Sequence, residues 1–275
     1  MFLKPQDKRL IAAASGGFLV FSLSCWLVLR LHALIPILWV MFTLLAALSI
    51  EMYRRVQRHL DSNTELYWQV QSLFELHSLV KADHPLPRMR GFAISPDFAA
   101  LLSATIRRVK PNLIVECGCG TSTVVSAYVL RDIGGGRILS LEHEEKYADA
   151  CRRELDRHGL TEFAEVIHAP LKTQEINGEF LTWYDLSNVP ADLAIDLLTV
   201  DGPPTSSSGI CARYPAGPAL LPRLTEKGVV LLDDTELKPN IKEAAKRWCE
   251  QFPWLRYDEI ACEKGAVILD RDCPK

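Results

Sequence analysis

The stretch VECGCGTSTVV, residues 115–125, decides how this sequence is interpreted. It places two cysteines, two glycines and a glutamate in a turn between apolar runs. Cys117 and Cys119 are not spaced as C-x-x-C, and no second pair or nearby histidine completes a zinc site. Glycines in a turn between an apolar strand and a helix instead let the backbone approach a bound ligand closely. The turn therefore indicates a ligand-binding α/β domain.

Length and charge narrow the class of protein. At 275 residues the chain is long enough for one α/β domain with an accessory part. The formal net charge of -3, with both signs mixed, argues against a nucleic-acid partner, which usually meets a basic surface. The eight cysteines are scattered along the chain, which favours reduced thiols in a cytosolic compartment over a disulfide framework.

Two apolar runs lie near the N-terminus. Residues 10–29 are an uncharged run of 20, and residues 33–50 are a second run of 18 after the connector Arg30-Leu31-His32. A helix of about 20 apolar residues crosses the roughly 30 Å hydrocarbon core, so both runs predict transmembrane helices in a tight hairpin. A signal peptide would leave the second run unexplained. The soluble alternative is a buried pair of core helices.

Basic residues flank this hairpin and predict its orientation. They are Lys4, Lys8 and Arg9 before it, and Arg54, Arg55 and Arg58 after it. The positive-inside rule then places both termini and the rest of the chain in the cytoplasm. The sequence thus predicts a multi-pass protein of the inner (cytoplasmic) membrane, with the bilayer as the partner of residues 10–50.

After residue 95, strand-like and helical stretches alternate. The expected strands are residues 112–117, 137–141, 164–168, 195–200, 228–233, 255–262 and 265–270. The expected helices are residues 122–132, 144–158, about 216–224 and 241–251, and Ser95-Pro96-Asp97 is a helix start with serine as N-cap. This alternation predicts a Rossmann-like, doubly wound α/β fold. Its sheet would have seven strands, mostly parallel, with a C-terminal antiparallel hairpin, and the two-helix transmembrane hairpin would precede it.

Between these parts, residues 59–82 carry apolar side chains at helical spacing. They are Leu66, Val70, Leu73, Leu76 and Val80. We expect an amphipathic helix that packs on the α/β domain or pairs with a second copy in a homo-oligomer. The predicted organisation is a hairpin at 1–58, this helix and a proline-broken linker at 59–95, and the α/β domain at 96–275.

The charge of the glycine turn discriminates between nucleotide ligands. Gly118-x-Gly120-x-x-Thr123 lacks the third glycine of a dinucleotide fingerprint, and Glu116 would face the negative charges of a pyrophosphate. S-adenosylmethionine carries an ammonium and a sulfonium at this end and no phosphate. Glu142, about twenty residues after the glycines, is placed to accept both ribose hydroxyls, as it would be for NAD. Coulomb's law favours S-adenosylmethionine.

Several motifs resemble one known family, the class I S-adenosylmethionine-dependent methyltransferases. They are IVECGCGTST, LSLEHEEKYADACRRELDRHGL, HAPLK, IDLLTVDGPP, ARYPAGPALLPRL and GVVLLDDT. Within the family the likeness is to a bacterial group with D-G-P-P and A-R-Y-P-A motifs, and it covers residues 85–270 but not the hairpin. Cys119 departs from the small, serine-like residue that members more often carry.

The resemblance implies roles for the matching positions. Glu116, Gly118 and Gly120 would hold the methionine part of the cofactor, within a turn that also includes Cys119, Thr121, Ser122 and Thr123. Glu142 would hold the ribose, His143 would flank the adenine and Ala169 would bound the adenine pocket. Asp201 would lie beside the transferred methyl group.

Two arrangements for deprotonating an acceptor stay open. Asp201 acts alone as the proton acceptor, or Asp201, Asp233 and Asp234 together bind Mg²⁺ through hard oxygen ligands. The alternative for Asp233 and Asp234 is a helix-capping turn.

Three further residues are candidates for binding the acceptor. Arg213 would hold an acidic acceptor or anchor its own loop, and Tyr214 and Tyr184 would line the acceptor pocket.

The sequence predicts a membrane-anchored methyltransferase that O-methylates a lipid-linked or membrane-associated small molecule or glycan at the cytoplasmic face. Three alternatives remain. The protein could methylate a membrane-protein target, it could be a non-catalytic cofactor-binding module, or it could be an NAD-dependent oxidoreductase, which the missing third glycine disfavours.

Overall fold

The computed structural model describes residues 5–29, 34–209, 211–237 and 239–271. The chain divides into two compact units, Met1–Tyr67 and Trp68–Lys275. The predicted connector at residues 30–32 and the basic residue Lys4 lie outside the described residues.

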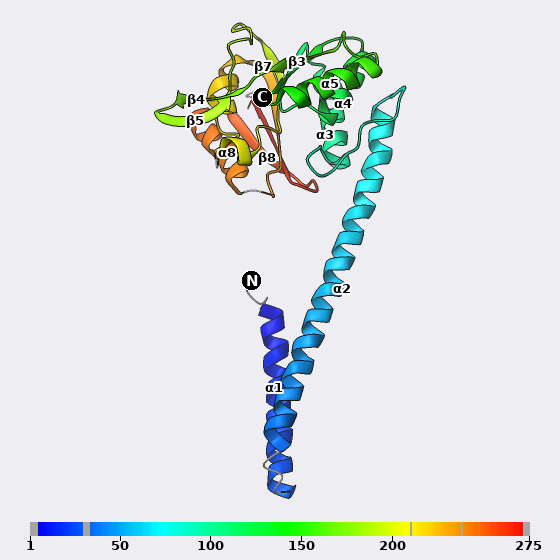
Figure 1. The fold of residues 1–275 in the computed structure, drawn as a ribbon, viewed down its shortest axis with the longest axis vertical. Coiled ribbons are helices and arrows are strands. Elements are labelled where there is room, and N and C mark those ends of the chain that lie inside the picture. Colours follow the sequence, from blue (N-terminus) through cyan, green and yellow to red (C-terminus); the bar gives the residue numbers. More distant parts are fainter. Residues whose placement is uncertain (1–4, 30–33, 210, 238, 272–275) are drawn as a thin grey trace. The chain divides into compact units, whose positions relative to one another are not determined.

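The first unit contains α1 (Pro5–Leu29) and the first part of α2 (Leu34–Leu79). The rings of Phe18 and Phe42 stack with centroids 4.4 Å apart, and Arg54 Nη2 lies 3.1 Å from Asp7 Oδ2. These two contacts place the helices side by side in opposite directions (Figure 1). Within the described residues, Asp7–Trp26 and Ile35–Leu79 are long and apolar enough to cross a membrane.

Helix α2 is longer than the sequence predicted. It continues from the second apolar run to Leu79, so the helix expected at residues 59–82 is its continuation. The sequence between residues 50 and 79 contains no glycine or proline, and nothing interrupts the helical hydrogen bonds.

The second unit is built on a sheet whose seven described strands have the order β3-β2-β1-β6-β7-β9-β8. Their bounds are β1 (Leu113–Cys117), β2 (Arg137–Glu142), β3 (Ala164–His168), β6 (Ile195–Val200), β7 (Leu224–Asp233), β8 (Leu255–Ile260) and β9 (Ala266–Arg271). The first five pair in parallel, β9 runs antiparallel to β7, and β8 runs antiparallel to β9. The predicted fold class is confirmed.

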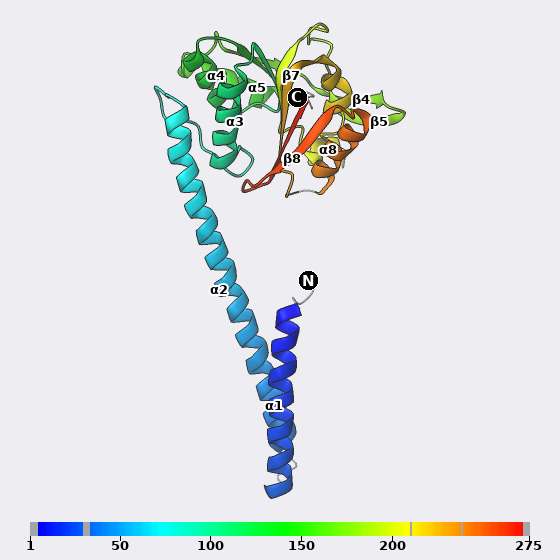
Figure 2. The same cartoon turned by 180° about the vertical axis from the view of Figure 1, so that it is seen from behind.

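Helices cover both faces of this sheet. One side carries α3 (Pro96–Val109), α4 (Thr121–Ile133) and α5 (Glu145–Arg157), and the other carries α7 (Ala216–Leu220) and α8 (Pro239–Gln251) (Figures 1 and 2). Short segments α6 (Thr205–Ser208) and η1 (Leu221–Arg223) complete the set. The side chains of β1 alternate between the two cores: Ile114 packs under α3 and α4, and Val115 packs on the opposite side. Pro96 begins α3 as predicted, but the hydroxyl of Ser95 makes no capping hydrogen bond.

A second, two-stranded sheet was not predicted. It consists of β4 (Leu171–Ile176) and β5 (Glu179–Tyr184), which pair antiparallel. Asn177 and Gly178 join them with φ angles of 52° and 81°. An Asn-Gly pair between strands favours this turn because both positions need a positive φ, so the sequence did contain the signal.

The last turns of α2, from Trp68 on, belong to the second unit and pack on its core. Leu76 and Val80 are buried in the core with α3 and α4, and Gln69 Nε2 donates to Asp97 Oδ2 at 2.8 Å. Val70 and Leu73, from the same predicted stripe, are 50% and 37% exposed. Only part of the predicted apolar face is therefore used within this unit.

Replacing Leu76 with alanine is expected to lower the free energy of unfolding by about 2–5 kcal/mol, because the change leaves a cavity in a packed core. Val70→Ala shortens a half-exposed side chain on the same helix and should cost much less. Urea unfolding of the detergent-purified chain, followed by tryptophan fluorescence, compares the two variants. Equal losses would contradict the packing of this end of α2.

Candidate functional site

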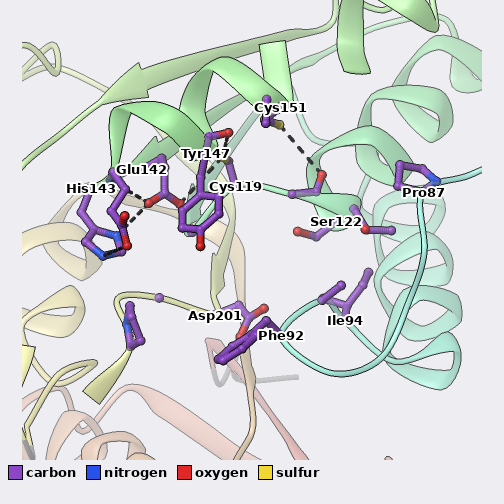
Figure 3. A pocket seen from close by; sticks show the side chains of 18 of the residues that line it. Pro87, Phe92, Ile94, Cys119, Ser122, Glu142, His143, Tyr147, Cys151 and Asp201 are labelled. Atoms are coloured by element: carbon purple, nitrogen blue, oxygen red, sulfur yellow. Dashed lines mark hydrogen bonds and ion pairs between the residues drawn. The ribbon is translucent and has the colours of Figure 1, made fainter. Parts of the chain in front are cut away.

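A cavity of about 650 Å³ lies at the carboxyl ends of β1, β2 and β6 (Figure 3). β1 lies between β2 and β6, so the strand order reverses here, and α/β proteins bind ligands at such a reversal. The structure brings many of the predicted residues together at this cavity. They are Gly118, Cys119, Gly120, Thr121, Ser122, Glu142, His143, Tyr184 and Asp201.

Gly118 and Gly120 have different structural roles in the turn. Gly118 has a φ of 95°, and a Cβ there would lie 3.2 Å from the backbone nitrogen of Gly202. Glycine is thus required both for conformation and for space. A Cβ at Gly120 would meet nothing within 4 Å, so this position borders open space where a ligand fits. Helix α4 starts directly after it, and the N–H groups of its first turn suit a carboxylate.

Glu116 stabilises the glycine turn through hydrogen bonds made inside the protein. It is fully buried and does not line the cavity. Its Oε2 accepts hydrogen bonds of 2.5 Å from the hydroxyls of Thr123 and Ser140, and Thr123 Oγ1 in turn accepts from Gly120 N at 2.9 Å. Its Oε1 has no hydrogen-bond partner among the described residues. Burial raises the pKa of Glu116 to about 7, although hydrogen bonds from neighbouring hydroxyls oppose the shift.

This raised pKa predicts a pH-dependent stability. The folded state keeps a proton on Glu116 that the unfolded state loses near pH 4.5, so stability falls as the pH rises through that value to about 7. Glu116→Gln removes the ionisation. Its free energy of unfolding, relative to that of the wild type, should rise by roughly 3 kcal/mol between pH 4.5 and 8.

Urea unfolding of the full chain at several pH values measures this difference. Glu165→Gln, at an exposed position in β3, controls for replacing a carboxylate by an amide. A constant difference between Glu116→Gln and the wild type would contradict the burial of an ionisable Glu116.

Glu142 and His143 form one wall of the cavity (Figure 3). Glu142 Oε1 accepts from the backbone N of Glu144 at 2.9 Å and lies 2.7 Å from His143 Nδ1. The carboxylate of Glu142 is therefore held in one orientation at the end of β2. Ala169 does not line the cavity: it is fully buried in the core, and its N–H donates to the carbonyl of Glu142 at 2.7 Å. Its predicted place at the border of the adenine pocket stays a prediction.

Tyr184 places a buried hydroxyl group at the cavity. Its side chain is fully buried and lines the cavity, yet its hydroxyl has no hydrogen-bond partner in the described part of the chain. Burial raises the pKa of this hydroxyl well above its usual value, so it stays a neutral donor. A buried, unpaired donor costs stability, which indicates that a ligand or water completes the site.

The three aspartates predicted to bind Mg²⁺ do converge. Carboxylate oxygens of Asp201, Asp233 and Asp234 lie within 4.8 Å of one another. The guanidinium of Arg213 already occupies this cluster, with Nη1 3.2 Å from Asp201 Oδ1 and Nη2 2.7 Å from Asp234 Oδ2. The cluster therefore does not fit a Mg²⁺ ion in this arrangement.

The predicted acceptor-binding roles of Arg213 and Tyr214 also need correction. Arg213 is 4% exposed and absent from the cavity lining, so it anchors its loop, the alternative that the sequence left open. Tyr214 is buried, its hydroxyl accepts from Asn177 Nδ2 at 3.0 Å, and the Arg247 guanidinium lies 3.6 Å from its ring centroid. It joins the β4–β5 hairpin to α8 rather than facing a substrate.

Sequence reasoning missed part of the lining. Pro87, Phe92 and Ile94 come from the segment taken as a linker, and Tyr147 comes from the first turn of α5. Phe92 is fully exposed. A proline-broken segment gives no periodic signal, so the sequence did not mark these residues.

The glycine turn, Glu142 and Asp201 all fall within a recognisable sequence family. Residues 115–235 match the model of a family described as a methyltransferase domain. This stretch is similar to a methyltransferase domain. No curated protein matches the sequence.

Two solved structures share the fold. An S-adenosylhomocysteine-bound methyltransferase of Podospora anserina, PaMTH1, has a TM-score of 0.51 at 17% identity, over 81% of this chain and 96% of its own. A proposed caffeoyl-CoA O-methyltransferase of Staphylococcus aureus has a TM-score of 0.50 at 14% identity, over 81% of this chain and 99% of its own. At these identities the likeness concerns the fold.

Proposed function

We propose that this protein is a membrane-anchored, S-adenosylmethionine-dependent O-methyltransferase. Its acceptor would be a lipid-linked or membrane-associated small molecule or glycan at the cytoplasmic face. The observation that carries the proposal is the convergence of the glycine turn, Glu142 and Asp201 on one cavity at the strand-order reversal. The match of residues 115–235 to a methyltransferase domain supports the same reaction class.

The cavity fits the cofactor in size and in chemistry. Its volume of about 650 Å³ lies within the usual range for small-molecule sites. The turn and the start of α4 would hold the amino-acid end, and Glu142 would accept hydrogen bonds from the ribose hydroxyls. The unpaired hydroxyl of Tyr184 is free to donate to a polar group of the ligand.

The charges on the cavity wall select for a cation. Four acidic side chains line it against one basic side chain, Glu142, Glu144, Glu154 and Asp201 against Arg153, and Glu142 is the one of the four without a lysine or arginine partner among the ion pairs of the described residues. Glu116 beneath the turn has a raised pKa, and a cationic ligand nearby would favour its ionised form. This balance stabilises an ammonium and a sulfonium and repels a pyrophosphate. It also favours an acceptor whose reacting end carries no phosphate.

Asp201 is the residue placed to receive the acceptor's proton. When bound, S-adenosylmethionine supplies an electrophilic methyl group, which the acceptor oxygen takes while the sulfur keeps the bonding electrons. Asp201 lies on the cavity wall at the end of β6, and burial raises its pKa while Arg213 opposes the shift. A carboxylate tuned in this way accepts a proton more readily than an exposed one. Ile94, which is buried, adds apolar surface to the cavity wall.

The hairpin would hold the enzyme where its acceptor is concentrated. Helix α1 and the first part of α2 carry large exposed apolar side chains, including Val20 and Leu48. In the proposed orientation the basic residues around Arg54 face the cytoplasm, and the protein lies in the inner membrane. Restricting enzyme and acceptor to one membrane raises their effective concentration without any new contact.

Calorimetric titration of the detergent-purified chain tests the cofactor. S-adenosylhomocysteine should bind with micromolar affinity and NADH should not bind. Glu142→Ala should weaken binding by about 1–3 kcal/mol, because it leaves ribose hydroxyls unpaired. Glu144→Ala, which removes a rim carboxylate paired with Lys146, is the matched control and should change affinity less. Absence of binding by a folded protein would end the proposal.

Asp201→Asn tests the proposed proton acceptor. It should lower methyl transfer from labelled cofactor to membrane extract by about 10²–10⁴-fold, the usual contribution of a general base. The affinity for S-adenosylhomocysteine should stay close to that of the wild type, since the amide keeps the size of the side chain. Wild-type turnover in this variant would remove Asp201 from the chemistry.

A further inference from the structure

Arg213 lies where the sequence pattern leads one to expect a metal ion. We infer that its guanidinium is the permanent cation of the Asp201–Asp233–Asp234 cluster, that it excludes divalent ions, and that it positions Asp201. The part of this inference that concerns Asp201 rests on the proposed function. Arg213 is then a positioning residue in a methyltransferase that needs no divalent metal ion.

The contacts of the guanidinium match those of a hard cation. Nη1 lies 3.2 Å from the carbonyl oxygen of Val200, 3.2 Å from Asp201 Oδ1 and 3.3 Å from the carbonyl oxygen of Asp233. Nη2 lies 2.7 Å from Asp234 Oδ2. Two carboxylates and two backbone carbonyls are the donor types that Mg²⁺ and Ca²⁺ take in proteins. One side chain thus bridges the carboxyl ends of β6 and β7.

Two cations of the protein already face the carboxylates of this cluster. Lys264 Nζ lies 3.5 Å from Asp234 Oδ1, so a second cation faces the same carboxylates, and Lys264 is itself buried. A divalent ion among these groups would lie a few ångströms from two fixed positive charges and would be repelled. Arg213 cannot relieve this repulsion by losing its proton, because a guanidinium stays charged at any pH that the fold tolerates.

The backbone on both sides of Arg213 is held by buried neighbours and hydrogen bonds. Ala212 and Tyr214 on either side are buried. The carbonyl of Tyr214 accepts from Trp248 Nε1 at 2.8 Å, and the carbonyl of Arg213 accepts from Ala216 N at 3.2 Å. The guanidinium thus extends from a fixed backbone and is held by four oxygen acceptors. A fixed fork instead suits the task of holding a carboxylate in one rotamer.

Asp201 is the carboxylate that benefits. It lines the cavity, while Asp233 and Asp234 do not. The guanidinium of Arg213 forms ion pairs with both Asp201 and Asp234, so Asp234 helps to hold the guanidinium in place. Removing the guanidinium would free a set of three converging acidic groups, whose spacing is close to the roughly 4 Å between opposite ligands of Mg²⁺.

Binding of Mn²⁺, measured by electron paramagnetic resonance on the detergent-purified full chain, tests the inference. The wild type should bind no Mn²⁺ at this cluster. Asp234→Asn should therefore leave its Mn²⁺ binding unchanged. Arg213→Gln should bind Mn²⁺ about tenfold or more tightly than the wild type, because it removes one fixed charge from among the ligands. Arg213→Lys keeps that charge and should stay like the wild type. The double variant Arg213→Gln/Asp234→Asn should lose the new site.

Two results would overturn the inference. In the first, the wild type binds Mn²⁺ and Asp234→Asn removes that binding. In the second, the Arg213→Gln variant is folded but gains no Mn²⁺ binding. If circular dichroism shows that Arg213→Gln is unfolded, the wild-type comparison with Asp234→Asn still decides the question. Neither measurement uses cofactor binding or turnover, so failure of the proposed function is detected separately by the S-adenosylhomocysteine titration. Where methyl transfer is detected, excess chelator should leave its rate unchanged.

Discussion

The close approach of two backbone turns is the constraint on which the site depends. Gly118 follows β1 and Gly202 follows β6, and a Cβ on either residue would lie within 3.2 Å of the other's backbone. The N–H of Asp201 donates to the carbonyl of Cys117 at 3.0 Å and fixes the register of the two turns. This contact brings the glycine turn and Asp201 to the same cavity, although 83 residues separate Gly118 from Asp201 in the sequence. A larger residue at either glycine would separate the two groups.

Buried acids are stabilised in two different ways on either side of this contact. Glu116 is surrounded by neutral hydroxyls and Oε1 has no partner among the residues described, so burial raises its pKa and a cationic ligand would favour its ionised form. Asp201 and Asp234 are instead paired with the cations Arg213 and Lys264. Asp201 and Asp234 therefore have charged partners within the protein, whereas Glu116 has only neutral ones. Glu116 is thus suited to binding a ligand, and the ion pairs of Arg213 are suited to positioning Asp201.

The sequence could predict features that depend on neighbouring residues better than features that depend on residues distant in the chain. The strands of the large sheet were predicted closely, because each is a short apolar run bounded by turn residues, which is a local signal. The turn residues and Glu142 could be placed for the same reason, since they follow strand ends directly. Tyr214 and Arg213 could not, because their roles depend on Asn177 and Asp234, which are distant in sequence. The β4–β5 hairpin is a different case: Asn177-Gly178 was a local signal and was overlooked.

The position of β9 has a consequence for how the protein is made. β9 pairs with β7 on one side and β8 on the other, so the last of the described strands to be synthesised fills an interior place in the sheet. Chains generally fold from the N-terminus as they leave the ribosome. The apolar helices α1 and α2 emerge before any strand, whereas the sheet stays divided until residues 266–271 are released. In the proposed membrane-anchored protein, attachment to the membrane would therefore precede completion of the sheet, and each new chain would finish folding beside the bilayer.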